Sequence, residues 1–311
     1  MTSKSIKRKT ITDKVVRYLL LSFTVFCSLV ILVIIGFIIY KGLSPFIKTY
    51  EVDGVEVKVN FWKFITGTTY FTYPNNYGAL YIIINTIYVT LLALLIAVPI
   101  SILTALFISK IAPKKIGKIF NAIIELLASI PSVIYGVFGA GIITIIVKNL
   151  ASLFNYQSAG GLSTLASSLV LAMMIIPTIT MVSVTSINAV KKDVILGSLA
   201  LGASPIETNF KVVLVSAKHG IFSGIILGVG RALGEATAVS MVCGNKGSGP
   251  SFNIFDTTKT LTSAMLQNIH ESSGLDYDIR FSIGLLLIII IIVTNLLLNF
   301  INKKVGRYYV K

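Results

Sequence analysis

Two charged residues, Arg231 and Glu235, lie four positions apart in an apolar stretch, residues 220–242, that is long enough to cross a bilayer. An arginine at membrane depth costs about 2.5–3.5 kcal/mol even on lenient insertion scales, so its side chain should face protein or water rather than lipid. A guanidinium offers a planar fork of donors that matches the oxygens of an oxyanion. Arg231 is therefore a candidate contact for an anion that crosses the membrane.

A plainer interpretation of the same stretch is structural. If residues 220–242 form one helix, Arg231 and Glu235 share a face and could neutralise each other as an (i, i+4) ion pair. The same face is rich in small residues, which would let another helix approach closely. The residue types alone leave both interpretations open. The small residues of this face are Gly220, Gly224, Gly228 and Ala238.

A third charged residue, Glu125, lies about seven residues, or roughly 10 Å, inside another apolar run. Either it is a buried structural acid, protonated or paired, or it takes part directly in a path across the membrane. Three apolar stretches also contain a proline, and each proline removes a backbone hydrogen bond and favours a kink. These prolines are Pro99, Pro131 and Pro177.

The composition is that of a membrane protein. Of 311 residues, 55% are hydrophobic and 13% charged, and the mean hydropathy is +0.87; these values fit a polytopic membrane protein better than a soluble core. We predict an all-α fold with six transmembrane helices. The expected spans are residues 18–40, 79–109, 119–147, 162–187, 220–242 and 281–301.

The formal net charge of +15 would suit a nucleic-acid partner, but the positions of the basic residues argue against one. With six spans both termini share a side, and 18 of the 27 Lys and Arg residues fall on that side. The other side carries 8, nearly balanced by 7 acidic residues. The positive-inside rule then makes both termini cytoplasmic, and attraction to anionic lipid accounts for the charge.

This topology divides the chain into five parts. The basic tail and the first transmembrane helix are followed by an extracytoplasmic loop, a five-helix core and a short second tail. The core contains one long cytoplasmic loop, residues 188–218. In order, the parts are residues 1–17, 18–40, 41–78, 79–301 and 302–311.

The long cytoplasmic loop is predicted to be ordered. Residues 194–201 suit a helix that Gly202 then stops, and Ser204, Pro205 and Glu207 match a capping box that starts a second helix. The loop should therefore be a helix, a glycine corner and another helix. A rigid knob of this kind requires a socket on a partner protein.

Several motifs resemble one known family. The corner Leu199-Ala200-Leu201-Gly202-Ala203, followed by Ser204, is similar to the coupling loop by which ABC importer permeases dock onto their ATPase subunits. The run Gly230-Arg231-Ala232-Leu233-Gly234-Glu235 and its continuation through residues 238–245 resemble the PstC-type phosphate permeases of binding-protein-dependent importers. Residues 125–136 and 176–178 resemble the same family.

This resemblance implies the type I importer permease fold in a bacterial or archaeal plasma (inner) membrane. It implies that the chain forms half of a phosphate path that works by alternating access, with Arg231 meeting the anion and Glu235 orienting Arg231. The implied partners are a second, PstA-like permease subunit, two ATPase subunits, an extracytoplasmic phosphate-binding protein and membrane lipid, and no nucleic acid. The implied cofactors, ATP and Mg²⁺, would bind the ATPase subunits.

Three further features limit the alternatives. The chain has no Gly-x-x-x-x-Gly-Lys-Ser/Thr loop, so we expect no ATP site and no enzymatic activity of its own. Its cysteines, Cys27 and Cys243, and its histidines, His219 and His270, lack metal-ligand spacing. The alternatives are a sulfate or molybdate permease, a membrane enzyme with an acid pair of Glu125 and Glu235, and a scaffold without transport.

Overall fold

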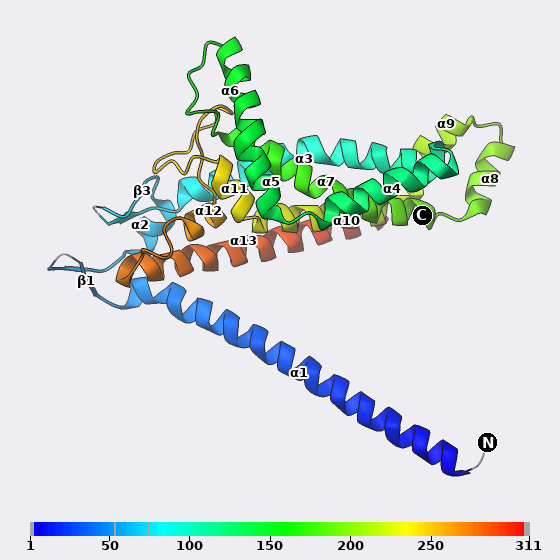
Figure 1. Ribbon diagram of the computed structural model, residues 1–311, viewed down its shortest axis with the longest axis horizontal. Coiled ribbons are helices and arrows are strands. Elements are labelled where there is room, and N and C mark those ends of the chain that lie inside the picture. Colours follow the sequence, from blue (N-terminus) through cyan, green and yellow to red (C-terminus); the bar gives the residue numbers. More distant parts are fainter. Residues whose placement is uncertain (1–2, 53, 74, 308–311) are drawn as a thin grey trace.

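The computed structural model describes residues 3–52, 54–73 and 75–307, which form a bundle of long helices (Figure 1). Within these ranges, six helical segments are long and apolar enough to cross a membrane, which confirms the expected number of spans. The outermost residues of the two predicted tails, 1–2 and 308–311, lie outside the described residues. The six segments are Asp13–Ile47, Leu80–Ile111, Ser132–Leu153, Thr164–Asn188, Pro205–Gly234 and Gly274–Lys304.

Three helices form the centre of the bundle: α3 (Leu80–Leu106), α7 (Thr164–Asn188) and α10 (Leu214–Gly234). Small residues let these helices approach, as is usual where the surrounding solvent is lipid. A Cβ added to Gly228 of α10 would lie only 2.8 Å from the Ile179 side chain of α7. The expectation that glycines of residues 220–242 face another helix is thus confirmed.

The third apolar stretch is not one helix, so the predicted continuous span over residues 119–147 is wrong. Helix α4 (Lys114–Ser129) stops at Ile130 and Pro131, whose backbones are extended with ψ of 126° and 142°. The cause is Pro131, which lacks an N–H and pushes the preceding residue out of the α region. The other two prolines, Pro99 and Pro177, lie within continuous helices.

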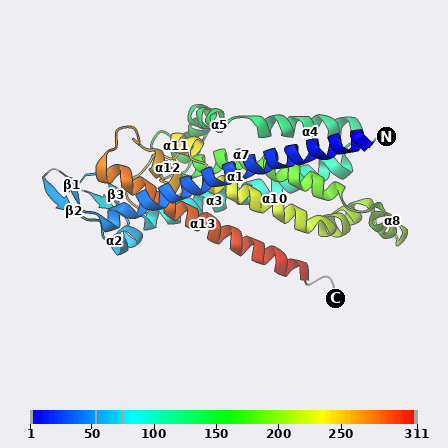
Figure 2. The same ribbon diagram turned by 90° about the horizontal axis from the view of Figure 1, so that it is seen from below.

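After this break the chain changes direction. Helix α5 (Ser132–Phe138), the π-helical segment η2 (Gly139–Ile143) and α6 (Thr144–Leu153) follow one another. Figure 1 shows them leaving the direction of α4 and α7 at a steep angle, and Figure 2 shows α5 nearly end-on. The break therefore separates a helix along the bundle from one that crosses it.

One end of the bundle carries two short hairpins and is called the hairpin end below. Strand β1 (Tyr50–Val52) pairs antiparallel with β2 (Val55–Val57), and β3 (Tyr70–Phe71) with β4 (Asn76–Tyr77). Two short helices, α2 (Phe61–Thr66) and α12 (Leu261–Leu266), lie among them.

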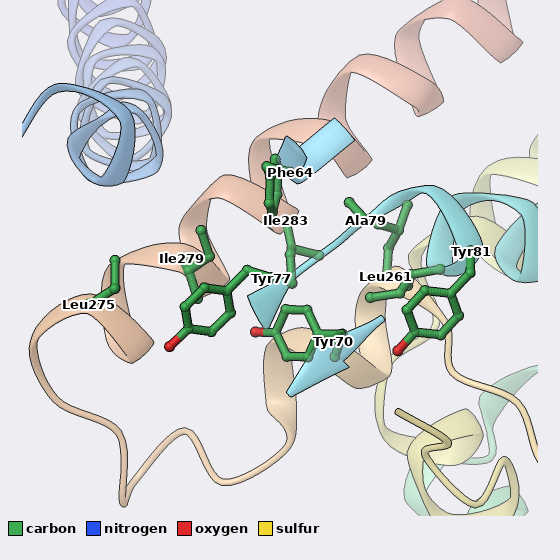
Figure 3. Close-up of a cluster of buried hydrophobic side chains, with 11 residues drawn as sticks. Phe64, Tyr70, Tyr77, Ala79, Tyr81, Leu261, Leu275, Ile279 and Ile283 are labelled. Atoms are coloured by element: carbon green, nitrogen blue, oxygen red, sulfur yellow. The ribbon is translucent and has the colours of Figure 1, made fainter. Parts of the chain in front are cut away.

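The hairpin end has its own buried core (Figure 3). Tyr70 and Tyr77 from the second hairpin pack beside Leu261 of α12 and Ile279 of α13 (Gly274–Arg307). Aromatic rings bury a large apolar area, so they hold these short elements on the bundle. Segments far apart in the sequence are thereby fixed against each other.

The opposite end, called the corner end, carries α8 (Lys192–Ala200), α9 (Pro205–Glu207) and the π-helical segment η3 (Thr208–Val213), which leads into α10. The beginning of α1 (Ser3–Ile47) and the end of α13 also lie toward this end in both views (Figures 1 and 2). The described parts of the two termini therefore share a side of the molecule, as six spans require.

Helix α1 diverges from the rest of the bundle (Figure 1). Near its last turns, Ser282 Oγ of α13 donates to the Gly42 carbonyl over 2.6 Å, and Lys41 Nζ lies 2.9 Å from Asp278 Oδ1. None of the most apolar part of α1 is buried against the chain. Most of this helix is thus left to contact lipid or another protein.

Candidate functional site

Arg231 lies near the end of α10, half-exposed, and contacts α7. Its Nη1 donates to Thr178 Oγ1 over 2.8 Å. Thr178 follows Pro177, in the Ile-Pro-Thr run that carried part of the family resemblance. The guanidinium is thus held by a neutral hydroxyl, which fixes its position without cancelling its charge.

The Arg231 side chain lines an open cavity of about 590 Å³ between α7, α10 and α13. Asn295 and Asn299, one turn apart on α13, line the same cavity, as does Ser223 of α10. Amides and a hydroxyl beside a guanidinium can donate several hydrogen bonds to one anion. We call this the Arg231 cavity.

The two asparagines were missed by the sequence analysis. A signal was present, because Asn295 and Asn299 are two amides at helical (i, i+4) spacing in an otherwise apolar run. Polar side chains in a transmembrane helix face protein or water rather than lipid. Their common face is the one that lines the Arg231 cavity.

Glu235 does not pair with Arg231, so the (i, i+4) ion pair of the structural interpretation is absent from the described chain and the continuous helix over residues 220–242 is wrong. Helix α10 ends at Gly234, Glu235 is extended with ψ of 121°, and α11 begins at Thr237 (Thr237–Val242). Glu235 Oε1 instead accepts from the Ala238 N–H over 3.0 Å and from Thr237 Oγ1 over 3.2 Å.

The physical reason is that a helix start attracts a carboxylate. The first N–H groups of α11 have no partner within the helix, and an acceptor placed before them satisfies one of them and meets the positive end of the dipole. The Gly234 at the end of α10 lowers the cost of breaking the helix there. Glu235 consequently caps α11 and does not neutralise Arg231.

The two helix breaks meet in space. Ser132 Oγ, directly after the Pro131 break, lies 3.1 Å from Thr237 Oγ1, directly after the Glu235 break. A Cβ on Gly136 of α5 would fall 2.9 Å from the Ala238 Cα of α11, so a residue without a side chain is needed there. Helix ends that meet inside a membrane protein offer backbone and side-chain groups to a polar solute.

Glu125 lies elsewhere. It is exposed on α4 and accepts from Asn121 Nδ2 over 2.6 Å, so the described part of the chain does not bury this acid but does give it a hydrogen-bond partner. It lines a groove of about 710 Å³ between α4 and α7, together with Lys114 and Lys118. The residues of this groove are distinct from those of the Arg231 cavity. The structure therefore does not bring Glu125 together with Arg231.

The corner between α8 and α9 matches its prediction. Gly202 has a φ of +88°, a left-handed conformation that favours glycine, and the capping box between Ser204 and Glu207 is complete. Ser198 Oγ of α8 lies 2.9 Å from Thr208 Oγ1 of η3, which braces the corner. The second helix does not end within the predicted loop, because α9 passes through η3 into α10 and Pro205–Gly234 is one helical segment. The predicted loop end at residue 218 and span start at residue 220 are therefore wrong.

The corner presents apolar side chains outward. Leu201 is 90% exposed and Ile206 is 72% exposed, although both belong to an ordered, hydrogen-bonded segment. Leu199 and the alanines beside it complete the predicted motif on α8 and the turn after it. Exposed apolar side chains on a rigid knob are typical of a surface that a partner covers.

The sequence of the chain matches a known family of membrane transport proteins. Residues 97–309 match the model of a family described as binding-protein-dependent transport system inner membrane component. The chain belongs to this family. It is thus a multi-pass integral membrane protein of a transport system, and the family component is the membrane permease rather than the ATPase.

Three relatives show the range of the family. A probable ABC transporter permease protein, YqgH, of Bacillus subtilis is 38% identical over 73% of this chain and 72% of its own. The phosphate transport system permease protein PstC of Pasteurella multocida is 36% identical over 75% of this chain and 78% of its own. A probable phosphate transport system permease protein PstC of Methanocaldococcus jannaschii is 31% identical over 93% of this chain and 90% of its own.

The fold also has a solved counterpart. A chain of a bacterial alginate ABC transporter, crystallised in complex with an alginate-bound periplasmic protein, superimposes with a TM-score of 0.65 at 16% identity, over 97% of both chains. At this identity the likeness shows the fold alone. The predicted importer permease fold is confirmed.

The contacts of Arg231 predict the result of two double-mutant cycles on thermal unfolding of the purified chain in detergent. Arg231→Gln and Thr178→Val should be coupled by about 0.5 kcal/mol or more, because the two side chains share a hydrogen bond. Arg231→Gln and Glu235→Gln should be additive within about 0.5 kcal/mol. Strong coupling in the second cycle, with none in the first, would restore the ion pair and contradict the geometry.

Proposed function

We propose that the chain is the transmembrane permease subunit of an ATP-driven phosphate importer. The observation that carries this proposal is the Arg231 cavity, in which a guanidinium without a carboxylate partner among the described residues lies beside amides and hydroxyls. Such a set suits a tetrahedral oxyanion. Relatives in two distant organisms are named phosphate transport permeases, and this selects phosphate among the oxyanions.

In the proposed mechanism, alternating access exposes the Arg231 cavity first to one side of the membrane and then to the other. Arg231 donates to the anion, and Thr178 holds the guanidinium in place. The role of Glu235 changes from the one that the family resemblance implied. It fixes the start of α11 and, with Thr237 and Ser132, links the two helix breaks, so that α5 and α11 move together.

The exposed first helix supports the proposal of a second, PstA-like permease subunit. Residues 18–40 of α1 are apolar and largely exposed, and they diverge from the rest of the chain (Figure 1). In the proposed complex, part of this surface packs on the second permease and the remainder faces lipid. An extracytoplasmic phosphate-binding protein docks at the hairpin end.

The corner end is proposed to dock onto two ATPase subunits, one for each permease, and these subunits hold ATP and Mg²⁺. Leu201 and Ile206 supply the apolar contacts, and the left-handed Gly202 sets the direction of the corner. Movement of the ATPase subunits is transmitted through Ser198 and Thr208 to η3 and α10. Because Arg231 lies on α10, the corner and the anion cavity share one rigid element.

The proposed orientation places the hairpin end outside the cell and the corner end in the cytoplasm. In a Cys27→Ser background, Ser273→Cys at the hairpin end should react with an impermeant thiol reagent added to intact cells. Lys192→Cys on α8 should react only after the membrane is opened. Both positions are exposed in the chain, so access and not burial decides the result. The reverse pattern would invert the topology.

Replacement of Gly202 tests the coupling role. In the left-handed region a β-branched residue is strained by about 1–2 kcal/mol. Gly202→Val should therefore change the backbone conformation of the corner, weaken its contact with the ATPase subunit and uncouple ATP hydrolysis from transport. Gly197→Val is the matched control, because Gly197 lies in α8 and a Cβ there meets no other atom within 4 Å. Unchanged coupled hydrolysis in Gly202→Val complexes would remove the corner from the mechanism.

The transport function is tested by ATP-dependent uptake of labelled phosphate into vesicles that contain the whole complex. We expect excess unlabelled phosphate to compete strongly and sulfate and molybdate weakly. Arg231→Lys, which keeps the charge and loses the planar fork, should reduce uptake at least ten-fold in assembled complexes. Preferential competition by sulfate or molybdate would reassign the substrate within the same transport class.

A further inference from the structure

A second polar cavity lies at the hairpin end, away from the Arg231 cavity. It has a volume of about 190 Å³, several times the share of one water molecule in the liquid, which is about 30 Å³. It is bounded by strand β3, the segment that follows α11, and the start of α13. The polar residues that line it include Tyr70, Asn245, Lys259, Gln267, Asn268 and Arg280.

Lys259 is the unusual member of this set, because only 3% of it is exposed and no carboxylate in the described chain pairs with it. Its Nζ lies 5.0 Å from the centroid of the Tyr70 ring, a cation–π contact. A buried ammonium is costly unless it is paired or hydrogen-bonded. Burial, first of all, and then the nearby charge of Arg280 lower the pKa of Lys259 to about 8.

Arg280 brings a second positive charge to the same cavity and is 4% exposed. Its Nη1 donates to the Ala264 carbonyl over 3.1 Å and to the Gln267 carbonyl, and its Nε donates to Ser272 Oγ over 2.9 Å. These contacts fix the guanidinium at the end of α12. They contain no carboxylate, so the charge is offset by the carbonyl groups at the end of α12 rather than by an ion pair.

The nearby acids are engaged elsewhere. Asp276 accepts a hydrogen bond from the Tyr77 hydroxyl, and Asp278 pairs with Lys41 and accepts from Tyr50. Neither residue lines the cavity. Within the described chain, neither cation of the cavity pairs directly with a carboxylate, although the negative charge of Asp276 also acts on the Tyr70 hydroxyl.

A hydroxyl completes the site. Tyr70 lines the cavity, its ring packs in the core of the hairpin end (Figure 3), and its hydroxyl oxygen is buried without a hydrogen-bond partner from the described chain. Buried polar groups in proteins are nearly always paired. An unpartnered phenolic O–H of a residue that lines the same cavity as two cations can donate to an anion there.

We propose that this cavity binds an inorganic tetrahedral oxyanion of the phosphate class, held by Lys259 and the Tyr70 hydroxyl within the positive field of Arg280. The alternative is structural, with Lys259 held by the Tyr70 ring alone. An anion explains more, because it pairs the ammonium and the hydroxyl at once. Binding itself is independent of the proposed function, whereas a role as a waiting site for transported phosphate rests on it.

The waiting-site role follows from position. Thr262 Oγ1, one residue into α12 and three residues after Lys259, donates over 2.7 Å to the carbonyl of Glu235 at the break between α10 and α11. The segment that carries Lys259 is thus hydrogen-bonded to the helix break next to Arg231. In this role, an anion released at the hairpin end binds beside Lys259 and Arg280 before it reaches the Arg231 cavity.

Binding is tested by amine labelling of the whole purified complex in detergent at pH 7.5. Part of the Lys259 amine is neutral at this pH because its pKa is lowered, and the neutral amine is the form that reductive methylation modifies. The small reagent enters through the cavity that Lys259 lines. Inorganic phosphate, against chloride at equal ionic strength, should slow modification of Lys259 at least five-fold and leave the exposed Lys63 unchanged, as measured by peptide mass spectrometry. Equal rates with and without phosphate would overturn the site.

Two variants separate the anion site from a structural role. Tyr70→Phe keeps the ring and the cation–π contact but removes the hydroxyl, so protection of Lys259 should require several-fold more phosphate. Tyr88→Phe is the matched control, because the Tyr88 hydroxyl donates to the Phe252 carbonyl outside this cavity. This variant should leave the protection of Lys259 by phosphate unchanged. If protection needs phospholipid nanodiscs and not inorganic phosphate, the occupant is a lipid headgroup and the proposal is wrong.

The waiting-site role has its own readout. Once vesicles with the wild-type complex are shown to take up phosphate, the variants are compared with them. Lys259→Met should raise the phosphate concentration for half-maximal uptake at least five-fold. Lys259→Arg should give a half-maximal concentration close to that of the wild type. Unchanged uptake by Lys259→Met would remove the site from the path. Absence of phosphate uptake by the wild type would instead refute the proposed function, and the labelling result would still decide binding.

Discussion

Every polar group that this chain places at bilayer depth needs a partner from the protein, because lipid supplies none. Two helix breaks create such groups, one at Pro131 and one at Glu235, and the structure brings the two breaks together. Ser132 and Thr237 bond each other, Glu235 caps α11, and Thr262 satisfies the Glu235 carbonyl. The positions of α5, α11 and α12 are consequences of this requirement.

The sequence predicted the parts of the fold that depend on local properties. The number of spans follows from the length of apolar runs, and the corner at Gly202 follows from residues that act within one turn of themselves. Arg231 was identified because a charge in an apolar run is conspicuous. In each case the interaction that decides the outcome lies within a few residues along the chain.

The failures have the opposite origin. The structural interpretation paired Glu235 with Arg231 because the two are neighbours on an uninterrupted helix. In the structure the carboxylate instead caps a new helix start, and Gly234 lowers the cost of the break. The choice between these arrangements depends on α5 and α12, which contact α11 from distant parts of the sequence. Lys259 and Tyr70 are separated by nearly two hundred residues, so no local pattern could indicate their contact.

The placement of cations along the molecule constrains how an anion could move through it. Lys259 and Arg280 lie at the hairpin end, Arg231 lies on α10 beside the helix breaks, and each is left without a carboxylate partner in the described chain. A single deep site with all three charges would bind an anion too tightly to release it. In the proposed mechanism, separate sites with one or two cations each and neutral donors allow transfer in steps of moderate affinity. The position of Glu235 also fits this mechanism. A direct ion pair with Arg231 would occupy the donors that the proposed anion needs. Because Glu235 caps α11 instead, the guanidinium contacts Thr178 and lines the cavity.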